Sequence, residues 1–199
     1  MRRKCQSHNS RSEVRSQKPG ASSGYTIIEL VIVIMVMLVV GGIIVGILYS
    51  AIRGTTKARV NNNISQNGSY AITVMTNFLA NAKALIQVTD PFGNVFDSCV
   101  SDGVNPIDGV SVTIQNYDGG ITTFACENGY ISSNSASLIH TEDVEMITET
   151  CRMLCIQDSF YSVPRIDISF ELQNKNAQDP ATSGRSLFET SVNLRNYGL

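Results

Sequence analysis

The sequence has no tryptophan and little charge. Of its 199 residues only 16% are Asp, Glu, Lys or Arg, against roughly a quarter in an average soluble protein. The formal net charge of -2 shows no excess of positive charge, so there is no reason to expect nucleic-acid binding. With seven Phe, seven Tyr and no Trp, a core can contain few large aromatic side chains. We therefore expect the fold to need additional stabilisation.

Motifs of catalytic chemistry are lacking as well. No Gly-x-x-x-x-Gly-Lys-Ser/Thr phosphate loop occurs, so any ATPase that works with this protein must be another chain. His140 is the only His outside the N-terminal stretch and has no neighbour that would make it a base. Cys151 and Cys155 are separated by three residues, whereas thioredoxin-like pairs are separated by two. We expect no enzymatic activity, cofactor or metal site, although a four-cysteine zinc site stays open as an alternative.

Proline is absent between Tyr25 and Asp90, and the first part of this stretch is almost free of charge. From Tyr25 to Ile52 the only charged residue is Glu29. Ile27–Leu48 alone is about as long as the roughly 20 residues that cross a bilayer core. Only a helix satisfies the backbone polar groups of a single segment there. We predict a transmembrane helix over residues 25–52.

The helical pattern continues beyond the apolar stretch. From Ile52 to Ile86 apolar residues recur mostly three and four positions apart, with polar residues between them. Pro91, followed by Gly93, is a stop signal for a helix. The pattern predicts an amphipathic continuation of the helix over residues 53–90, and its apolar stripe needs a partner surface from the rest of the chain.

Residues 1–24 are polar and basic, with six Lys or Arg and one Glu. This composition cannot form a core and is typical of a leader peptide. By the positive-inside rule the leader stays cytoplasmic, which places the C-terminal part outside. Arg53, Lys57 and Arg59 oppose this orientation, but they are fewer than the basic residues of the leader. An uncleaved signal anchor would have the same hydropathy and stays open as an alternative.

The residues from Gly24 to Ile34, GYTIIELVIVI, resemble the prepilin signature of type IV pilins and type II secretion pseudopilins. After a basic leader this signature has a Gly, an apolar and often aromatic residue, Thr, two apolar residues, Glu and a long apolar helix. The resemblance implies cleavage by prepilin peptidase between Gly24 and Tyr25, followed by N-methylation of the new Tyr25 amine. Tyr25 replaces the commonest Phe, and the leader is long, as in some pilin subgroups.

The resemblance also implies a function and partners. Such a subunit is a single-pass, N-in protein of the inner (cytoplasmic) membrane that later joins an extracytoplasmic filament. Its partners would be prepilin peptidase, other pilin or pseudopilin subunits, and an inner-membrane assembly platform with a separate ATPase. The expected function is a structural subunit, a minor pilin or pseudopilin, of a type IV pilus or type II secretion-like filament. The alternative is a membrane-anchored extracellular binding domain that does not polymerise.

Three residues within the apolar stretch are candidates for assembly. A carboxylate inside an apolar helix is costly, so Glu29 needs a partner. Cleavage after Gly24 would create a positive amine at Tyr25, and the amine of a neighbouring subunit could pair with Glu29 and select the register. Snorkelling of Glu29 to the headgroups is the alternative. Gly42 and Gly46 form a Gly-x-x-x-Gly element that lets helices approach closely, unless they are simply tolerated.

Four cysteines lie beyond Pro91: Cys99, Cys126, Cys151 and Cys155. An even set in an exported domain is typical of disulfides, while free thiols of a cytosolic protein are the alternative. If Cys151 and Cys155 lie on one strand, their Cα atoms are about 13 Å apart. That distance is too long for a disulfide. Each would then pair with Cys99 or Cys126, which leaves two connectivities, and on a helix this deduction fails.

The chain beyond Pro91 has strand and turn signals. Tyr117-Asp118-Gly119-Gly120 is typical of a hairpin turn. The segments with a strand pattern are Val110–Asn116, Ile121–Cys126, Val144–Cys155, Val163–Leu172 and Leu187–Leu194. The sequence therefore predicts an α+β fold in which residues 91–199 form a disulfide-stapled, β-rich head, with the long N-terminal helix packed on its antiparallel sheet.

Overall fold

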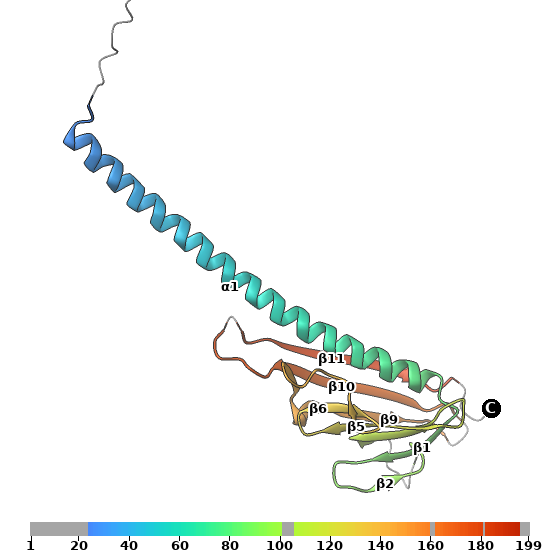
Figure 1. The fold of residues 1–199 in the computed structure, drawn as a ribbon. Helices are drawn as coiled ribbons and strands as arrows, with labels where there is room; N and C mark the ends of the chain where they lie inside the picture. Colours follow the sequence, from blue (N-terminus) through green and yellow to red (C-terminus); the bar gives the residue numbers. More distant parts are fainter. Residues whose placement is uncertain (1–23, 101–105, 160–161, 181, 196–199) are drawn as a thin grey trace, which may run out of the picture. The chain divides into compact units, whose positions relative to one another are not determined.

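The protein has an α+β fold, as the sequence predicts. The computed structural model describes residues 24–100, 106–159, 162–180 and 182–195. These residues form one long helix followed by eleven strands and a short 3-10 helix (Figure 1). Contacts divide the chain into two compact units, Met1–Gly46 and Ile47–Leu199. The helix contributes residues to both units, and all the strands belong to the second.

Helix α1 (Ile27–Ala80) begins two residues after Tyr25. Thr26 starts it: the Thr26 side-chain oxygen accepts a hydrogen bond from the Glu29 amide at 3.3 Å, and the Thr26 carbonyl accepts one from Leu30 at 3.1 Å. Such bonds satisfy amides that have no partner within the helix. The helix then runs without interruption through the apolar stretch and through the Asn-rich segment around Asn62.

The predicted helical boundary at residue 90 is wrong. α1 ends at Ala80, and Ala84–Thr89 forms strand β1. The backbone amide of Lys83 already donates to the carbonyl of Gln115, at 2.8 Å, so the chain enters the sheet at once. β-branched Ile86, Val88 and Thr89 favour a strand, and pairing with β4 (Ser111–Gln115) decides the conformation in the absence of a helix-breaking proline.

Six strands form one antiparallel sheet. Besides β1 and β4 it contains β2 (Val95–Phe96), β5 (Ile121–Glu127), β6 (Tyr130–Ser133) and β7 (Ala136–Ser137), in the order β2-β1-β4-β5-β6-β7. The predicted hairpin between β4 and β5 is confirmed. Asn116 and Gly120 bond across its turn at 2.7 Å, and Gly119 has a φ of 86° that other residues rarely adopt.

Five strands form a second antiparallel sheet. They are β3 (Ile107–Gly109), β8 (Val144–Met146), β9 (Arg152–Ile156), β10 (Arg165–Asn174) and β11 (Arg185–Asn193). The order is β11-β10-β9-β3, and β8 pairs with the end of β10 beyond β9. The single strand predicted for Val144–Cys155 is therefore wrong. The 3-10 helix η1 (Thr148–Thr150) separates β8 from β9, because the Thr150 hydroxyl bonds the Ile147 carbonyl and accepts from the Glu171 amide.

The two sheets meet where β3 continues into β4. The Val110 amide donates to Thr89 of β1, and the Val110 carbonyl accepts from Cys126 of β5, both at 2.8 Å. Gly109 lies close to β1, since a Cβ atom there would be 2.5 Å from Val88. The chain thus passes from the second sheet to the first just after Gly109. A side chain at Gly109 would force Val88 to shift.

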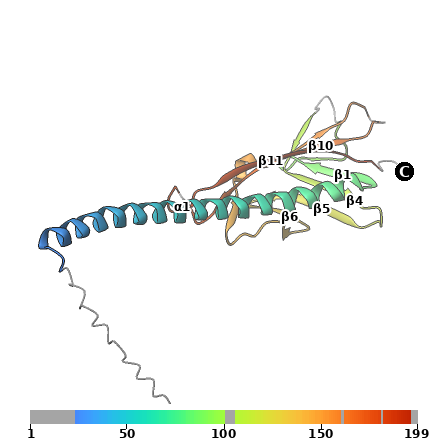
Figure 2. The ribbon, with the colours of Figure 1, turned by 90° about the horizontal axis from the view of Figure 1, so that it is seen from above.

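The core of the second unit lies between the two sheets and the C-terminal part of α1. The helix buries Ile64, Gly68, Ala71, Met75 and Leu79, which follow the predicted three- and four-residue spacing. Phe78 packs edge-on against Phe124 of β5, with ring centroids 6.1 Å apart. Figures 1 and 2 show this part of α1 running beside β11, and the amide of Arg195 donates to the carbonyl of Ala80 at 3.3 Å.

Candidate anchoring and assembly site

Among the residues that the structure describes, the apolar stretch has no packing partner. Its large hydrophobic residues from Tyr25 to Val45 are exposed on every side of the helix, with Ile27 85% exposed. Burying this much apolar surface is strongly favourable, so an apolar environment must surround it in a stable protein. By length and composition α1 has one segment that can cross a membrane.

The bond predicted for cleavage lies outside the helix. Gly24 and Tyr25 precede α1, and both are exposed, so a protease can reach the peptide bond between them without unwinding a turn. Glu29 is also exposed, one turn beyond this bond, and its amide is held by Thr26. No ion pair joins Glu29 to another residue of the part of the chain that the structure describes. Its carboxylate is therefore available to a group from outside the chain.

Gly42 and Gly46 lie one turn apart on the exposed helix. A Cβ atom added at either position would meet no atom within 4 Å. The two glycines thus form a shallow, open strip to which a second helix can come close. Gly68, on the same helix, is different: a Cβ there would lie 2.2 Å from the Phe188 ring. That glycine is needed for packing inside the protein, and the spacing of glycines in the sequence does not distinguish the two roles.

The four cysteines form two disulfides. Cys99 pairs with Cys155 and Cys126 pairs with Cys151, which is one of the two connectivities that the strand argument left open. Cys155 lies in β9 and Cys151 directly before it, so the two cysteines are kept apart by an extended backbone. The Cys126–Cys151 bond joins β5 of one sheet to the start of β9 of the other. Cys99–Cys155 ties the segment after β2 to β9.

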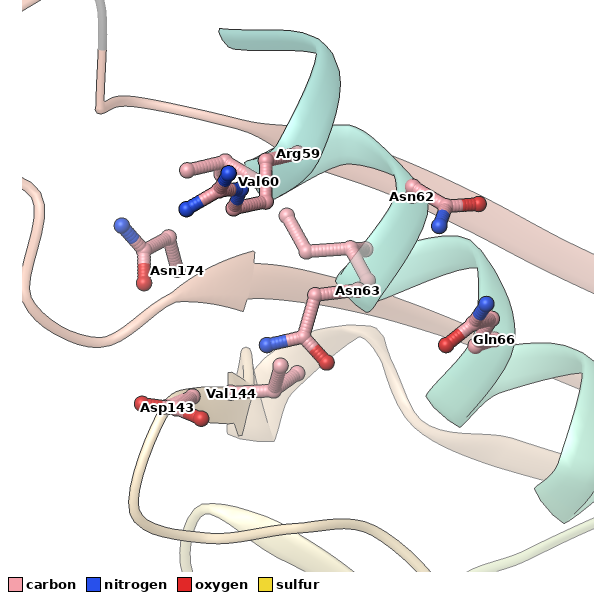
Figure 3. Close-up of a pocket in the computed structure, with 9 residues that line it drawn as sticks. Arg59, Val60, Asn62, Asn63, Gln66, Asp143, Val144 and Asn174 are labelled. Carbon is pink, nitrogen blue, oxygen red and sulfur yellow. The ribbon is translucent and has the colours of Figure 1, made fainter. Parts of the chain in front are cut away.

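A groove lined mainly by polar residues lies beside residues 59–66 of α1. Arg59, Asn63 and Gln66 line it from the helix, and Asp143 and Asn174 line it from the strand side (Figure 3). Its volume is about 400 Å³. The groove contains amides and charged groups but no nucleophile paired with a base, so it offers contacts for a polar partner and no visible catalytic chemistry.

His140 lies at the surface beside this groove. Its Nδ1 is 3.7 Å from a carboxylate oxygen of Asp143, and both side chains are largely exposed. The His140 amide donates to the Asn67 side chain at 2.7 Å, which ties the loop before β8 to the helix. Within the described ranges no group of three or more His, Cys, Asp or Glu side chains is placed to hold a metal ion.

Among the described residues of the head, Asp90, Glu127 and Tyr130 have shifted pKa values. The side chain of Asn94 and nearby amides donate to Asp90 and lower the pKa of its carboxyl group. Ser132 and then Tyr130 donate to Glu127 and lower its pKa, while the same contact with Glu127 raises the pKa of Tyr130. These hydrogen bonds stabilise the turn at Asp90 and the β5–β6 pair.

No family model, no curated protein and no solved structure matches the chain.

Proposed function

We propose that the protein is a membrane-anchored structural subunit, a minor pilin or pseudopilin, of a type IV pilus or type II secretion-like filament. Prepilin peptidase cleaves it after Gly24 and the new Tyr25 amine is methylated. The subunit crosses the inner membrane once with its N-terminus inside. It then enters an extracytoplasmic filament by packing its N-terminal helix against those of other subunits, with help from an assembly platform and a separate ATPase.

One observation carries this proposal. Helix α1, whose first part is apolar and exposed, begins within one turn of an exposed Gly24–Tyr25 bond and has a single carboxylate, Glu29, in its first turn. A lipid anchor needs apolar residues, but it does not need a charge at this place, and an unpaired carboxylate there is costly. The amine that cleavage creates at Tyr25 of a neighbouring subunit can neutralise the Glu29 carboxylate when subunits pack together.

Substitution of Glu29 tests the proposal. Glu29→Gln keeps the size of the side chain and removes its charge, so filament incorporation should fall by about tenfold or more, since loss of one partner of a buried pair is costly. Glu29→Asp keeps the charge and should retain part of the filament incorporation. Glu142→Gln, at an exposed position of the head, is the control and should have no effect. Normal incorporation of Glu29→Gln would contradict the charge pairing.

The same variants separate the filament from its alternative. A membrane-anchored binding domain that does not polymerise would reach the membrane and keep its head exposed whether or not Glu29 is charged. A filament subunit should still reach the membrane as Glu29→Gln but accumulate there, because only its assembly is impaired.

A further inference from the structure

Three residues of α1 form a stripe just after the apolar stretch. Tyr49, Arg53 and Lys57 are four positions apart, so their side chains lie on one face of the helix. All three are exposed. The Arg53 guanidinium lies over the Tyr49 ring, 4.6 Å from its centroid. A cation held on an aromatic ring at this place combines a positive charge with an amphipathic side chain, which is the pairing that suits a membrane–water boundary.

Among the residues that the structure describes, the stripe has no negative partner. No Asp or Glu occurs between Glu29 and Asp90, so α1 has no acidic residue after its first turn. The ion pairs of the described residues all involve other side chains, and none includes Arg53 or Lys57. Positive residues next to a membrane segment oppose its translocation. The basic leader places Arg53 and Lys57 on the outer side of the membrane. We therefore expect an anionic group on that side that binds them.

The position of the stripe favours lipid headgroups over another protein. Arg53 and Lys57 lie about 7 and 13 Å beyond Leu48 along the helix axis. In a helix the Cα–Cβ bonds tilt toward the N-terminus, so both side chains lean back toward the apolar stretch. The headgroup layer beside the bilayer core is about 5 to 8 Å thick, within reach of long basic side chains. Neighbouring copies of α1 would offer only Glu29, at the opposite end of the apolar stretch.

We propose that Tyr49, Arg53 and Lys57 bind anionic lipid headgroups at the outer surface of the membrane. This inference rests on the membrane span that belongs to the proposed function, but not on filament formation. Arg53 and Lys57 contact the lipid phosphates, and Tyr49 lies at headgroup level with its hydroxyl toward water. The stripe thereby fixes the depth of the helix and retains the subunit in the membrane until assembly removes it.

The test uses the full chain reconstituted in phosphatidylcholine vesicles that contain a minor fraction of phosphatidylglycerol. Electron paramagnetic resonance of spin-labelled lipids gives the preference of the protein for phosphatidylglycerol over phosphatidylcholine. We expect a clear preference that added NaCl weakens, because salt screens exposed charges. The double variant Arg53→Gln, Lys57→Gln should weaken this preference by up to about fivefold for each residue, and the six basic residues of the leader account for the preference that remains.

A matched control keeps the change in net charge the same. Lys83→Gln, Arg195→Gln removes two exposed positive charges beyond the other end of α1 and should leave the lipid preference unchanged. Equal loss in both double variants, or no preference in the unchanged protein, would overturn the inference while leaving the membrane span intact. Failure of the unchanged protein to insert into the vesicles would overturn the span and the inference together.

Discussion

Helix α1 contains two stretches that meet their surroundings in opposite ways. From Ile27 to Gly46 apolar side chains cover every side of the helix, and none is buried within the protein. From Ile64 to Leu79 apolar residues form one stripe, and that stripe is buried against the two sheets. The first stretch of the helix therefore exposes its apolar side chains, whereas the second buries them in the core of the protein.

Along this one helix, the residues that stabilise the head lie apart from the exposed apolar residues. Residues of the second stretch determine whether the head folds, because their contacts lie inside the protein. Residues of the first stretch have no such contacts with the described residues, so we expect that substituting them leaves the fold of the head intact. Substitutions of the same type in the two stretches should therefore have different consequences.

The largest effect on the head should come from loss of a disulfide. Cys99–Cys155 closes a sequence separation of 56 residues and Cys126–Cys151 one of 25. By loop-closure entropy, replacing the first pair with Ala should cost about 4 kcal/mol and the second about 3.5 kcal/mol. Denaturant unfolding followed by tyrosine fluorescence and circular dichroism measures both. The apolar stretch should remain helical in detergent when the head unfolds, and simultaneous loss of the whole helix would contradict the division.

Two methionines of α1 give a matched comparison. Met75 is fully buried, whereas Met37 is 70% exposed. Met75→Ala should lower the unfolding free energy of the head by about 2–5 kcal/mol, because it removes buried contacts and leaves a cavity. Met37→Ala should leave head stability unchanged. Thermal unfolding of the two variants in the same detergent decides the matter, and similar shifts for both would break the comparison.

Two glycines extend the comparison to added atoms. Gly68→Ala places a methyl group against the Phe188 ring, which also stacks on Phe170 at 5.4 Å, and should cost about 1–3 kcal/mol of head stability. Gly46→Ala has open space around it and should not weaken the head. If Gly46 serves helix packing, this second variant should instead reduce filament incorporation. An unaltered head stability in Gly68→Ala would show that α1 can shift away from β11.

The smallest effect is the pH dependence contributed by Glu127. Hydrogen bonds from Ser132, at 2.6 Å, and from Tyr130 lower the pKa of Glu127 in the folded protein. This contribution to stability is complete above the pKa of the unfolded chain and is lost as the pH falls through the lower, folded pKa. Glu127→Gln should therefore reduce the loss of head stability on acidification below about pH 4. An unchanged acid dependence would contradict it.

The sequence predicts those features that depend on one segment at a time. The apolar stretch, the buried stripe of α1 and the hairpin at Gly119 follow from local spacing and turn chemistry. The end of α1 at Ala80 does not follow from local spacing. Leu85 and Val88 also fit a helical pattern, and only pairing with β4 makes their segment a strand. The division into two sheets also depends on a distant contact, that of Gly109 with Val88. The sequence does not distinguish Gly68 from Gly46. Their surroundings differ because the Phe188 ring packs against Gly68, whereas the space around Gly46 is open.

The candidate site was predicted in part. Cleavage at Gly24, pairing of Glu29 and packing at Gly42 remain predictions. The disulfides are confirmed, but the separation of Cys151 from Cys155 leaves two connectivities, and only the structure selects one of them. The groove beside Arg59 was not predicted, because Asp143 and Asn174 reach it from strands far along the chain.

The N-terminal residue and the intact mass of the protein, purified from the cells that make it, test the central claim most directly. We expect a chain that begins at Tyr25, with its amine methylated and both disulfides formed. A chain that still begins at Met1 would contradict processing by prepilin peptidase, and it would leave a signal-anchored extracellular domain as the function to examine.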